Sequence, residues 1–246
     1  MAVASTVGGR KPNGVDTEAM PFFACVHNPT CEGTEPCSIC FPRHEVPMRG
    51  MRVQAESTEV SGGFREAFEA VLGHTPRWEG FSLIVGDQLE RERVGIIETG
   101  TCRKPGDWAG DGQSTRVWDW VLSRKPGVAV SVDVEMASVE TAQKCCTRVH
   151  CVCQDSVTFL RGYIPFVPTL LYLDSRDWGP GAEVASCMQQ VAELAACWER
   201  LPAGCLIASD DSHNLQQGKP TLSRQLLKVL GIEPILDSYI VVWRRP

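Results

Sequence analysis

The chain has 246 residues, of which 43% are hydrophobic and 22% are charged, as in a globular protein with a sizeable core. Its formal net charge is −6, so no global basic field would attract a nucleic acid backbone, and we expect no nucleic acid partner. The longest apolar runs, such as YIPFVPTLLYL, are too short for a bilayer and contain prolines, so we expect no membrane partner. The first residues lack the apolar centre of a signal peptide, and we therefore expect a cytoplasmic protein.

Residues 1–20 are small and polar and show no periodicity, which predicts a disordered N-terminus. Residues 21–60 form a Cys-rich extension with the spacing C-x5-C-x5-C-x2-C. Four thiolates suit a tetrahedral Zn²⁺ ion, and zinc would supply folding energy that so short a segment lacks. The candidate ligands of this structural zinc are Cys25, Cys31, Cys37 and Cys40. The alternative is a flexible extension with reduced, unliganded cysteines. The other eight cysteines are predicted to be small core residues, because a reducing compartment disfavours disulfides.

Residues 61–246 show the pattern of one α/β domain. A helix is predicted over residues 61–74, where Phe64 and Phe68 recur at helical spacing, and a short one over residues 81–92. After that, apolar strands alternate with helices, and such strands need crossover connections. We therefore predict a Rossmann-like, mainly parallel sheet with helices on both faces. The strands are expected at 94–98, 127–134, 149–154, 169–174, 204–210 and 235–244, with helices at 115–124, 137–148, 155–162, 183–201 and 221–231.

Acidic residues follow almost every predicted strand. A parallel sheet binds its ligand outside the carboxyl ends of its strands, so these side chains should line one cleft. Such a cleft suits a cofactor with ribose hydroxyls, a cationic centre, a metal ion, or all three. The strand-end acids are Glu98, Asp133, Asp155, Asp174, Asp210 and Asp211.

The loop after the first strand, in IIETGTCRKPGDWAGDGQST, has the form of a nucleotide-binding turn but contains no GxGxxG. Its motif is E-x-G, and Glu98 would repel a phosphate held at the start of the next helix. A sulfonium cofactor tolerates a nearby carboxylate, so the turn favours S-adenosylmethionine over NAD. Asp133 can accept hydrogen bonds from a ribose, the alternative being a solvated acid at a strand end.

Asp174, Asp210 and Asp211 end two predicted strands, and their hard oxygen ligands suit Mg²⁺. A metal ion there would lower the pKa of a bound substrate hydroxyl. Asp177 or His213 would then accept the proton as general base. The alternative is that these acids are ordinary strand-end or helix-capping groups.

Residues 94–246 resemble class I S-adenosylmethionine-dependent methyltransferases, and within these the metal-dependent O-methyltransferases of the catechol, macrolide and sugar-modifying types. The matching features are E-x-G at Glu98 and Gly100, the ribose acid at Asp133, L-D at Asp174, and a later acidic pair. The resemblance implies that Gly112 and Ser114 contact the methionine end of the cofactor, and that Asp155 and Ser156 lie at its adenine. The implied cofactor-binding residues are Glu98, Gly100, Gly112, Ser114, Asp133, Asp155, Ser156 and Asp174.

The sequence departs from the catechol type in two places. The lysine base of that type, three residues after the L-D acid, is replaced by Asp177, which favours an aliphatic or sugar hydroxyl as acceptor. The first loop is also longer, and Trp108 in it would pack either on the cofactor or a sugar ring, or simply against the fold.

The sequence therefore predicts a methyltransferase that moves a methyl group from S-adenosylmethionine to a hydroxyl of a small molecule or sugar, with Mg²⁺ assisting. Three alternatives stay open: an NAD-dependent oxidoreductase, a non-catalytic adaptor with the same fold and a zinc knuckle, and a metal-free methyltransferase acting on nitrogen. Homo-oligomerisation is an open alternative to a monomer.

Overall fold

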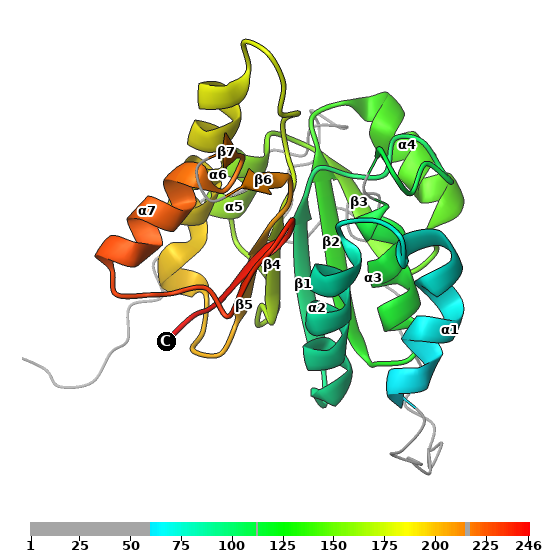
Figure 1. The fold of residues 1–246 in the computed structure, drawn as a ribbon. Helices are drawn as coiled ribbons and strands as arrows, with labels where there is room; N and C mark the ends of the chain where they lie inside the picture. The colour runs from blue at the N-terminus through cyan, green and yellow to red at the C-terminus, as the bar shows by residue number, and fades with distance from the viewer. Residues whose placement is uncertain (1–59, 112, 215–216) are drawn as a thin grey trace, which may run out of the picture. The chain divides into compact units, whose positions relative to one another are not determined.

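The computed structural model of the protein describes residues 60–111, 113–214 and 217–246 (Figure 1). The expected disordered N-terminus and Cys-rich extension lie outside the described residues. The zinc prediction therefore stays a prediction for all four of its ligands. Among the other predicted site residues, Gly112 is also outside the described part of the chain.

A seven-stranded sheet forms the centre of the fold, with the strand order β3-β2-β1-β4-β5-β9-β8. The first five strands of this order are parallel, and β9 and β8 are antiparallel additions at one edge. The chain runs outward from β1 to β3 and then returns to β4, so the order reverses between β1 and β4. This confirms the predicted Rossmann-like, mainly parallel sheet. Its strands are β1 (Val94–Thr99), β2 (Gly127–Asp133), β3 (Val149–Cys153), β4 (Leu170–Leu173), β5 (Leu206–Ser209), β8 (Leu236–Asp237) and β9 (Val241–Arg244).

Helices cover both faces of the sheet (Figure 1). One group packs on one face, and a second group packs on the opposite face, while α4 lies against β3 and β2. The first group is α1 (Val60–Leu72), α2 (Trp78–Glu90) and α3 (Ser114–Leu122). The second is α5 (Ser156–Arg161), α6 (Glu183–Cys197) and α7 (Thr221–Val229), and α4 spans Met136–Cys145.

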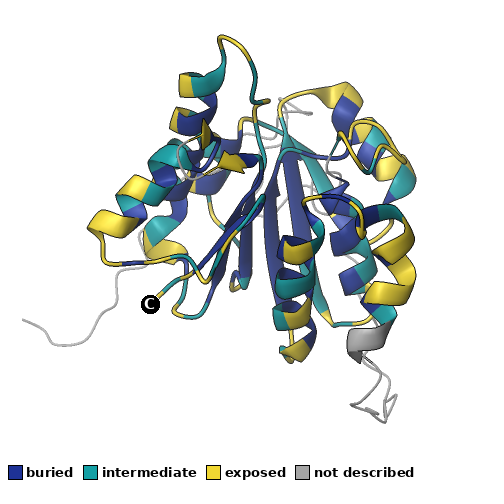
Figure 2. Cartoon of the chain, viewed as in Figure 1, coloured by how far each residue is buried: buried dark blue, intermediate teal, exposed yellow. Residues whose placement is uncertain are grey.

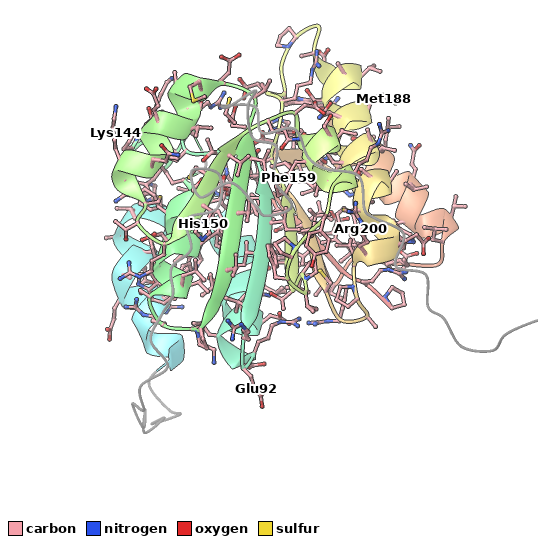
Figure 3. All side chains as sticks on the ribbon, turned by 180° about the vertical axis from the view of Figure 1, so that it is seen from behind. Glu92, Lys144, His150, Phe159, Met188 and Arg200 are labelled. Carbon is pink, nitrogen blue, oxygen red and sulfur yellow. The ribbon has the colours of Figure 1, made fainter. Side chains whose placement is uncertain are left out.

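The alternation of side chains along the strands divides the core into two layers. On β1, Ile96 packs with α1, α2 and α3, whereas its neighbour Ile97 packs with α6 and α7. Figure 2 shows the central strands β1, β4 and β5 buried and the outer helix surfaces exposed, whereas β3 at the edge of the sheet is only partly buried. Seen from behind, Phe159 of α5 lies over the sheet and packs on the second layer, while Met188 lies on the exposed side of α6 (Figure 3).

The structure differs from the predicted elements at several boundaries. The second helix begins at Trp78, three residues before the predicted start, and α6 ends at Cys197 in a single 3-10 turn, Trp198–Arg200. A short antiparallel hairpin after β5 was not predicted at all. It consists of β6 (Ser212–Asn214) and β7 (Gln217–Gly218), and these strands are too short to show a period in the sequence.

The eight cysteines of the α/β domain are free thiols. Five of them are buried, which confirms the predicted role as small core residues for Cys102, Cys146, Cys187, Cys197 and Cys205. The remaining three are half-buried. In the described ranges, no helix is long and apolar enough to cross a membrane.

Candidate functional site

A cleft of about 310 Å³ opens at the carboxyl ends of the parallel strands, where the strand order reverses between β1 and β4. This is where an open α/β sheet binds its ligand. The rule that a parallel sheet binds its ligand outside the carboxyl ends of its strands, here called the strand-end rule, therefore located the cleft and part of its lining. Six of the residues singled out in the sequence line it: Gly100, Asp133, Asp155, Ser156, Asp174 and Asp177.

Gly100 directly follows β1 and has a φ of +82°, which favours glycine. A Cβ atom at this position would lie 2.6 Å from the carbonyl oxygen of Asp174. The backbone at Gly100 therefore lies closer to the end of β4 than it could if this residue had a side chain. This close approach forms the floor of the cleft.

Asp133 ends β2, and both of its carboxylate oxygens accept backbone hydrogen bonds. Oδ2 accepts from the N–H of Thr101 at 3.2 Å, and Oδ1 accepts from the N–H of Glu135 at 2.8 Å. These bonds fix the carboxylate between the first two loops. Each oxygen keeps a further lone pair for a ligand, because a carboxylate offers about four acceptor positions.

Asp155 caps α5, since its Oδ1 accepts from the N–H of Thr158 at 2.8 Å. The next residue, Ser156, donates from its hydroxyl to the buried carboxylate of Glu193 on α6. The same Glu193 side chain accepts from Ser175 beside the cleft and from Thr99 at the end of β1. Glu193 thus links three segments of the cleft wall, although nothing in its helical sequence context distinguishes it.

Glu98 was expected at the cofactor, but the structure buries it completely. Its carboxylate accepts hydrogen bonds from the indole N–H of Trp118 at 2.8 Å and the hydroxyl of Thr115 at 2.7 Å, both on α3. Ser131 of β2 donates to it as well. Burial raises the pKa of Glu98 to about 7, and the hydrogen bonds oppose that rise. Glu98 therefore fixes α3 to the sheet beneath the cleft and does not line it.

Two further residues of the first loop also lie away from the cleft. Ser114, expected at the methionine end of the cofactor, is buried at the start of α3 and does not line the cleft. Trp108 packs its ring against Phe68 of α1, with a centroid distance of 5.5 Å, and the guanidinium of Arg116 lies 5.0 Å from its ring centroid. Of the two alternatives for Trp108, the structure shows packing against the fold.

The predicted metal ligands Asp174, Asp210 and Asp211 converge, as the strand ends required. Their carboxylate oxygens already pair with two basic side chains, Lys219 and Arg77, which were not among the predicted site residues. Lys219 Nζ lies 2.6 Å from Asp174 Oδ1 and 2.9 Å from Asp211 Oδ2. Arg77 donates from Nε to Asp210 at 2.8 Å and from an Nη to Asp211 at 2.9 Å. We call these five side chains the buried charge cluster.

Two tyrosines complete the hydrogen bonds of the buried charge cluster. Tyr172 on β4 donates its hydroxyl to Asp210 at 2.9 Å, and Tyr239 donates to Asp211 at 2.8 Å. Burial raises the pKa of both phenols, and the adjacent carboxylates raise it further, so both remain donors.

Burial and ion pairing shift the pKa values of the buried charge cluster in opposite directions. Burial tends to lower the pKa of Lys219, but Asp174 and Asp211 outweigh it and hold the pKa above its usual value. Burial raises the pKa of Asp174 above its usual value, although Lys219 opposes the rise. Burial acts in the same direction on Asp211, but Lys219 and Tyr239 outweigh it and bring the pKa of Asp211 below its usual value. The two carboxylates therefore favour the ammonium form of Lys219.

These residues do not fit Mg²⁺ as they stand. In the part of the chain that the structure describes, no group of three or more His, Cys, Asp or Glu side chains is arranged to hold a metal ion. Magnesium requires near-octahedral oxygen ligands at about 2.0–2.1 Å, and a lysine ammonium already lies between Asp174 and Asp211. The expected magnesium site is thus replaced here by an internal ion-pair network.

The two candidate bases occupy different places. Asp177 lines the cleft and pairs with Arg103 at 2.8 Å, which holds the pKa of Asp177 below its usual value. His213 is exposed on β6, with its ring centroid 5.8 Å from Tyr239 and 6.1 Å from Trp178. A second cavity, of about 440 Å³, is lined by His213, Tyr239 and Arg224 together with Ser212 and Asp237.

The sequence matches no protein-family model, and no curated protein matches it. Several solved structures are similar to this chain at low identity. A protein from Corynebacterium glutamicum is 13% identical, with a TM-score of 0.49 over 78% of this chain and 92% of that one. A calicheamicin methyltransferase is 13% identical, with a TM-score of 0.47 over 68% of this chain and 77% of that one.

The methyltransferase MycE of the mycinamycin pathway, solved with Mg, SAH and mycinamycin VI, is 14% identical with a TM-score of 0.45. The match covers 68% of this chain and 48% of MycE. All three similarities are too distant to assign an activity. The strand order of the sheet defines the fold.

Proposed function

We propose that the protein is an S-adenosylmethionine-dependent methyltransferase that acts on a hydroxyl group of a small molecule or sugar. The observation that carries the proposal is the charge of the cleft. Six carboxylates line it against two guanidinium groups, those of Arg103 and Arg176. A pyrophosphate would be repelled by this lining, whereas a sulfonium cation is attracted to it. The lining acids are Asp111, Asp133, Glu135, Asp155, Asp174 and Asp177.

The strand ends fit the parts of such a cofactor. Asp133, held by two backbone N–H groups, offers carboxylate lone pairs to the ribose hydroxyls, which are hydrogen-bond donors. Asp155 and Ser156 lie one strand further along, as an adenine site requires. Gly100 gives the methionine end access to the backbone at the floor. The bound cofactor would supply a methyl group on sulfur that an oxygen nucleophile can attack.

The protein's main contribution would be to align the two reactants and to accept the proton of the hydroxyl. We assign the proton to His213, because imidazole is the most frequent general base in enzymes and this ring is exposed at the second cavity. Asp177 is the weaker candidate, since its pairing with Arg103 stabilises the unprotonated carboxylate. The ring of His213 lies 6.1 Å from that of Trp178 and 5.8 Å from that of Tyr239, and aromatic rings of this kind suit packing against a sugar or another small ring.

Calorimetric titration with S-adenosylhomocysteine and, separately, with NAD tests the proposal. We expect the first to bind and the second not to bind. Asp133→Ala should weaken S-adenosylhomocysteine binding by about 10- to 100-fold, as expected for losing hydrogen bonds to a charged acceptor. Glu140→Ala, an exposed acid on α4 outside the cleft, is the matched control and should leave binding unchanged. Binding of NAD in place of S-adenosylhomocysteine would refute the proposal.

A further inference from the structure

The hairpin formed by β6 and β7 carries Lys219 back to the residue that ends β5. Gly218 pairs with Ser212 across the hairpin at a φ of +118°, and a Cβ there would lie 2.3 Å from the carbonyl oxygen of Asp211. The next residue donates its backbone N–H to that same oxygen at 3.2 Å. Lys219 is therefore held by Asp211 at both ends, through the backbone and through the ammonium.

The position of the ammonium is specific. Lys219 is 1% exposed, lines neither cavity, and has two carboxylate oxygens within 2.9 Å. One of these belongs to Asp174, which does line the cleft. Any substrate or cofactor in the cleft therefore meets a carboxylate whose charge and orientation are set from behind by a fixed cation.

We propose that Lys219 is a built-in substitute for a divalent cation between Asp174 and Asp211, and that the protein performs its chemistry without divalent metal. Metal and ammonium compete for the same oxygens. A divalent ion that bound Asp174 and Asp211 would leave the Lys219 ammonium buried without a partner, which is strongly unfavourable. Arg77 on the other side of Asp211 adds a second cation and lowers the attraction for a metal further.

This arrangement makes Lys219 a positioning residue that acts through Asp174. It also predicts a latent metal site. Without the ammonium, the carboxylates of Asp174 and Asp211, from two adjacent strand ends, face the space that Lys219 Nζ fills, and carboxylate oxygens together with water suit Mg²⁺ or Mn²⁺. The claim about methyl transfer without metal rests on the proposed function, whereas the claim about metal binding does not.

The test is calorimetric titration of the intact chain with MnCl₂ and MgCl₂, together with thermal unfolding in the presence and absence of each metal. We expect wild type to show no binding at millimolar metal and no shift in Tm. Lys219→Ala should bind Mn²⁺ in the millimolar range or tighter and gain several degrees in Tm. The matched control is Lys228→Ala, an exposed lysine on α7, which should behave as wild type.

A further variant shows whether the metal binds where we infer. Lys219→Ala combined with Asp174→Asn should lose the Mn²⁺ binding gained by the single change. If Lys219→Ala folds only when Mn²⁺ is present, that dependence supports the proposal too. If Lys219→Ala folds but shows neither Mn²⁺ binding nor a change in Tm with Mn²⁺, the latent metal site is refuted.

Wild-type protein that binds Mg²⁺ or Mn²⁺, and loses that binding on Asp174→Asn, would overturn the inference. Such a result would leave the proposed function intact, because S-adenosylhomocysteine binding is measured without metal.

Discussion

Arg77, the residue before α2, donates its Nε–H to the carboxylate of Asp210 at 2.8 Å, although the two are 133 positions apart in the chain. Both side chains are almost fully buried, so removing either one would leave the other as an unpaired charge inside the protein. It ties the helix layer on one face of the sheet to the end of β5.

We expect Arg77→Met to lower the free energy of unfolding by about 3–5 kcal/mol, because it leaves Asp210 buried without its cation. Urea unfolding measures this change. Arg65→Ala is the control, since Arg65 pairs with Glu69 at an exposed site on α1 and should cost no more than about 1 kcal/mol. Adding Asp210→Asn to Arg77→Met should recover part of the loss. Equal effects for Arg77→Met and Arg65→Ala would contradict a role for the buried pair.

Glu98 should make stability depend on pH. Its pKa in the folded state is raised to about 7 by burial, above the value of 4.5 for an unperturbed glutamate. The folded state thus binds this proton more tightly, so the stability that Glu98 contributes is fully present below pH 4.5. It is lost as the pH rises through about 7, by about 3 kcal/mol in total.

The measurement is the free energy of unfolding of wild type and Glu98→Gln at several pH values between 4.5 and 8. Glutamine cannot ionise, so the difference between the two proteins isolates this residue from the other buried carboxyls. We expect the variant to gain relative to wild type as the pH rises. A difference that stays constant over this range would show that Glu98 titrates as it does in the unfolded chain.

Gly100 and Gly181 provide a matched pair of glycines, since both have a φ of +82°. A Cβ at Gly181 would meet no atom within 4 Å, whereas one at Gly100 would lie 2.6 Å from the carbonyl oxygen of Asp174. Gly181→Ala should therefore cost about 1 kcal/mol from backbone strain alone. Gly100→Ala adds overpacking and should cost about 2–5 kcal/mol.

The same pair separates stability from function. Gly100→Ala should also weaken S-adenosylhomocysteine binding, because the floor of the cleft must shift, while Gly181→Ala should not. Chemical denaturation and calorimetry on the two purified variants give both quantities. Identical losses in the two proteins would mean that the close approach of β1 and β4 contributes nothing.

Trp108 is expected to act on stability and not on the cleft. Its ring packs on Phe68 and under Arg116, so Trp108→Ala should cost about 1–3 kcal/mol through lost burial and ring contacts. The Kd for S-adenosylhomocysteine should stay within a factor of about two of wild type. A large increase in Kd with unchanged stability would instead place Trp108 at the ligand.

The sequence predicts the sheet well because its strands are short, apolar and separated by helices, and only crossover connections fit that order. The strand-end rule then places Asp133, Asp155 and Asp174 in the cleft, since it depends on chain direction and not on side-chain packing. The prediction that Glu98 lies at the cofactor was wrong for a physical reason. Every residue of β1 is buried, so the strand shows no alternation that would tell which face the carboxylate occupies.

The basic partners of the acids were missed because the sequence contains no local sign of them. Arg77 lies in the turn before α2, and Lys219 follows a hairpin of only a few residues. Three acids near one strand edge are equally consistent with a metal and with internal cations, and only the tertiary contacts distinguish the two. Gly218 before Lys219 is the nearest signal, because it permits the tight hairpin that returns the lysine to Asp211.

The long separation between Arg77 and its two aspartates has a consequence for synthesis on the ribosome. Until residues 210 and 211 emerge, Arg77 lacks both of the carboxylates that pair with its guanidinium. The early part of the domain therefore lacks the ion pairs that stabilise its native packing around Arg77. We therefore expect the buried charge cluster to form only when the chain is nearly complete, and a nascent chain stalled before Asp210 to be more exposed to chaperones and proteases than the finished chain.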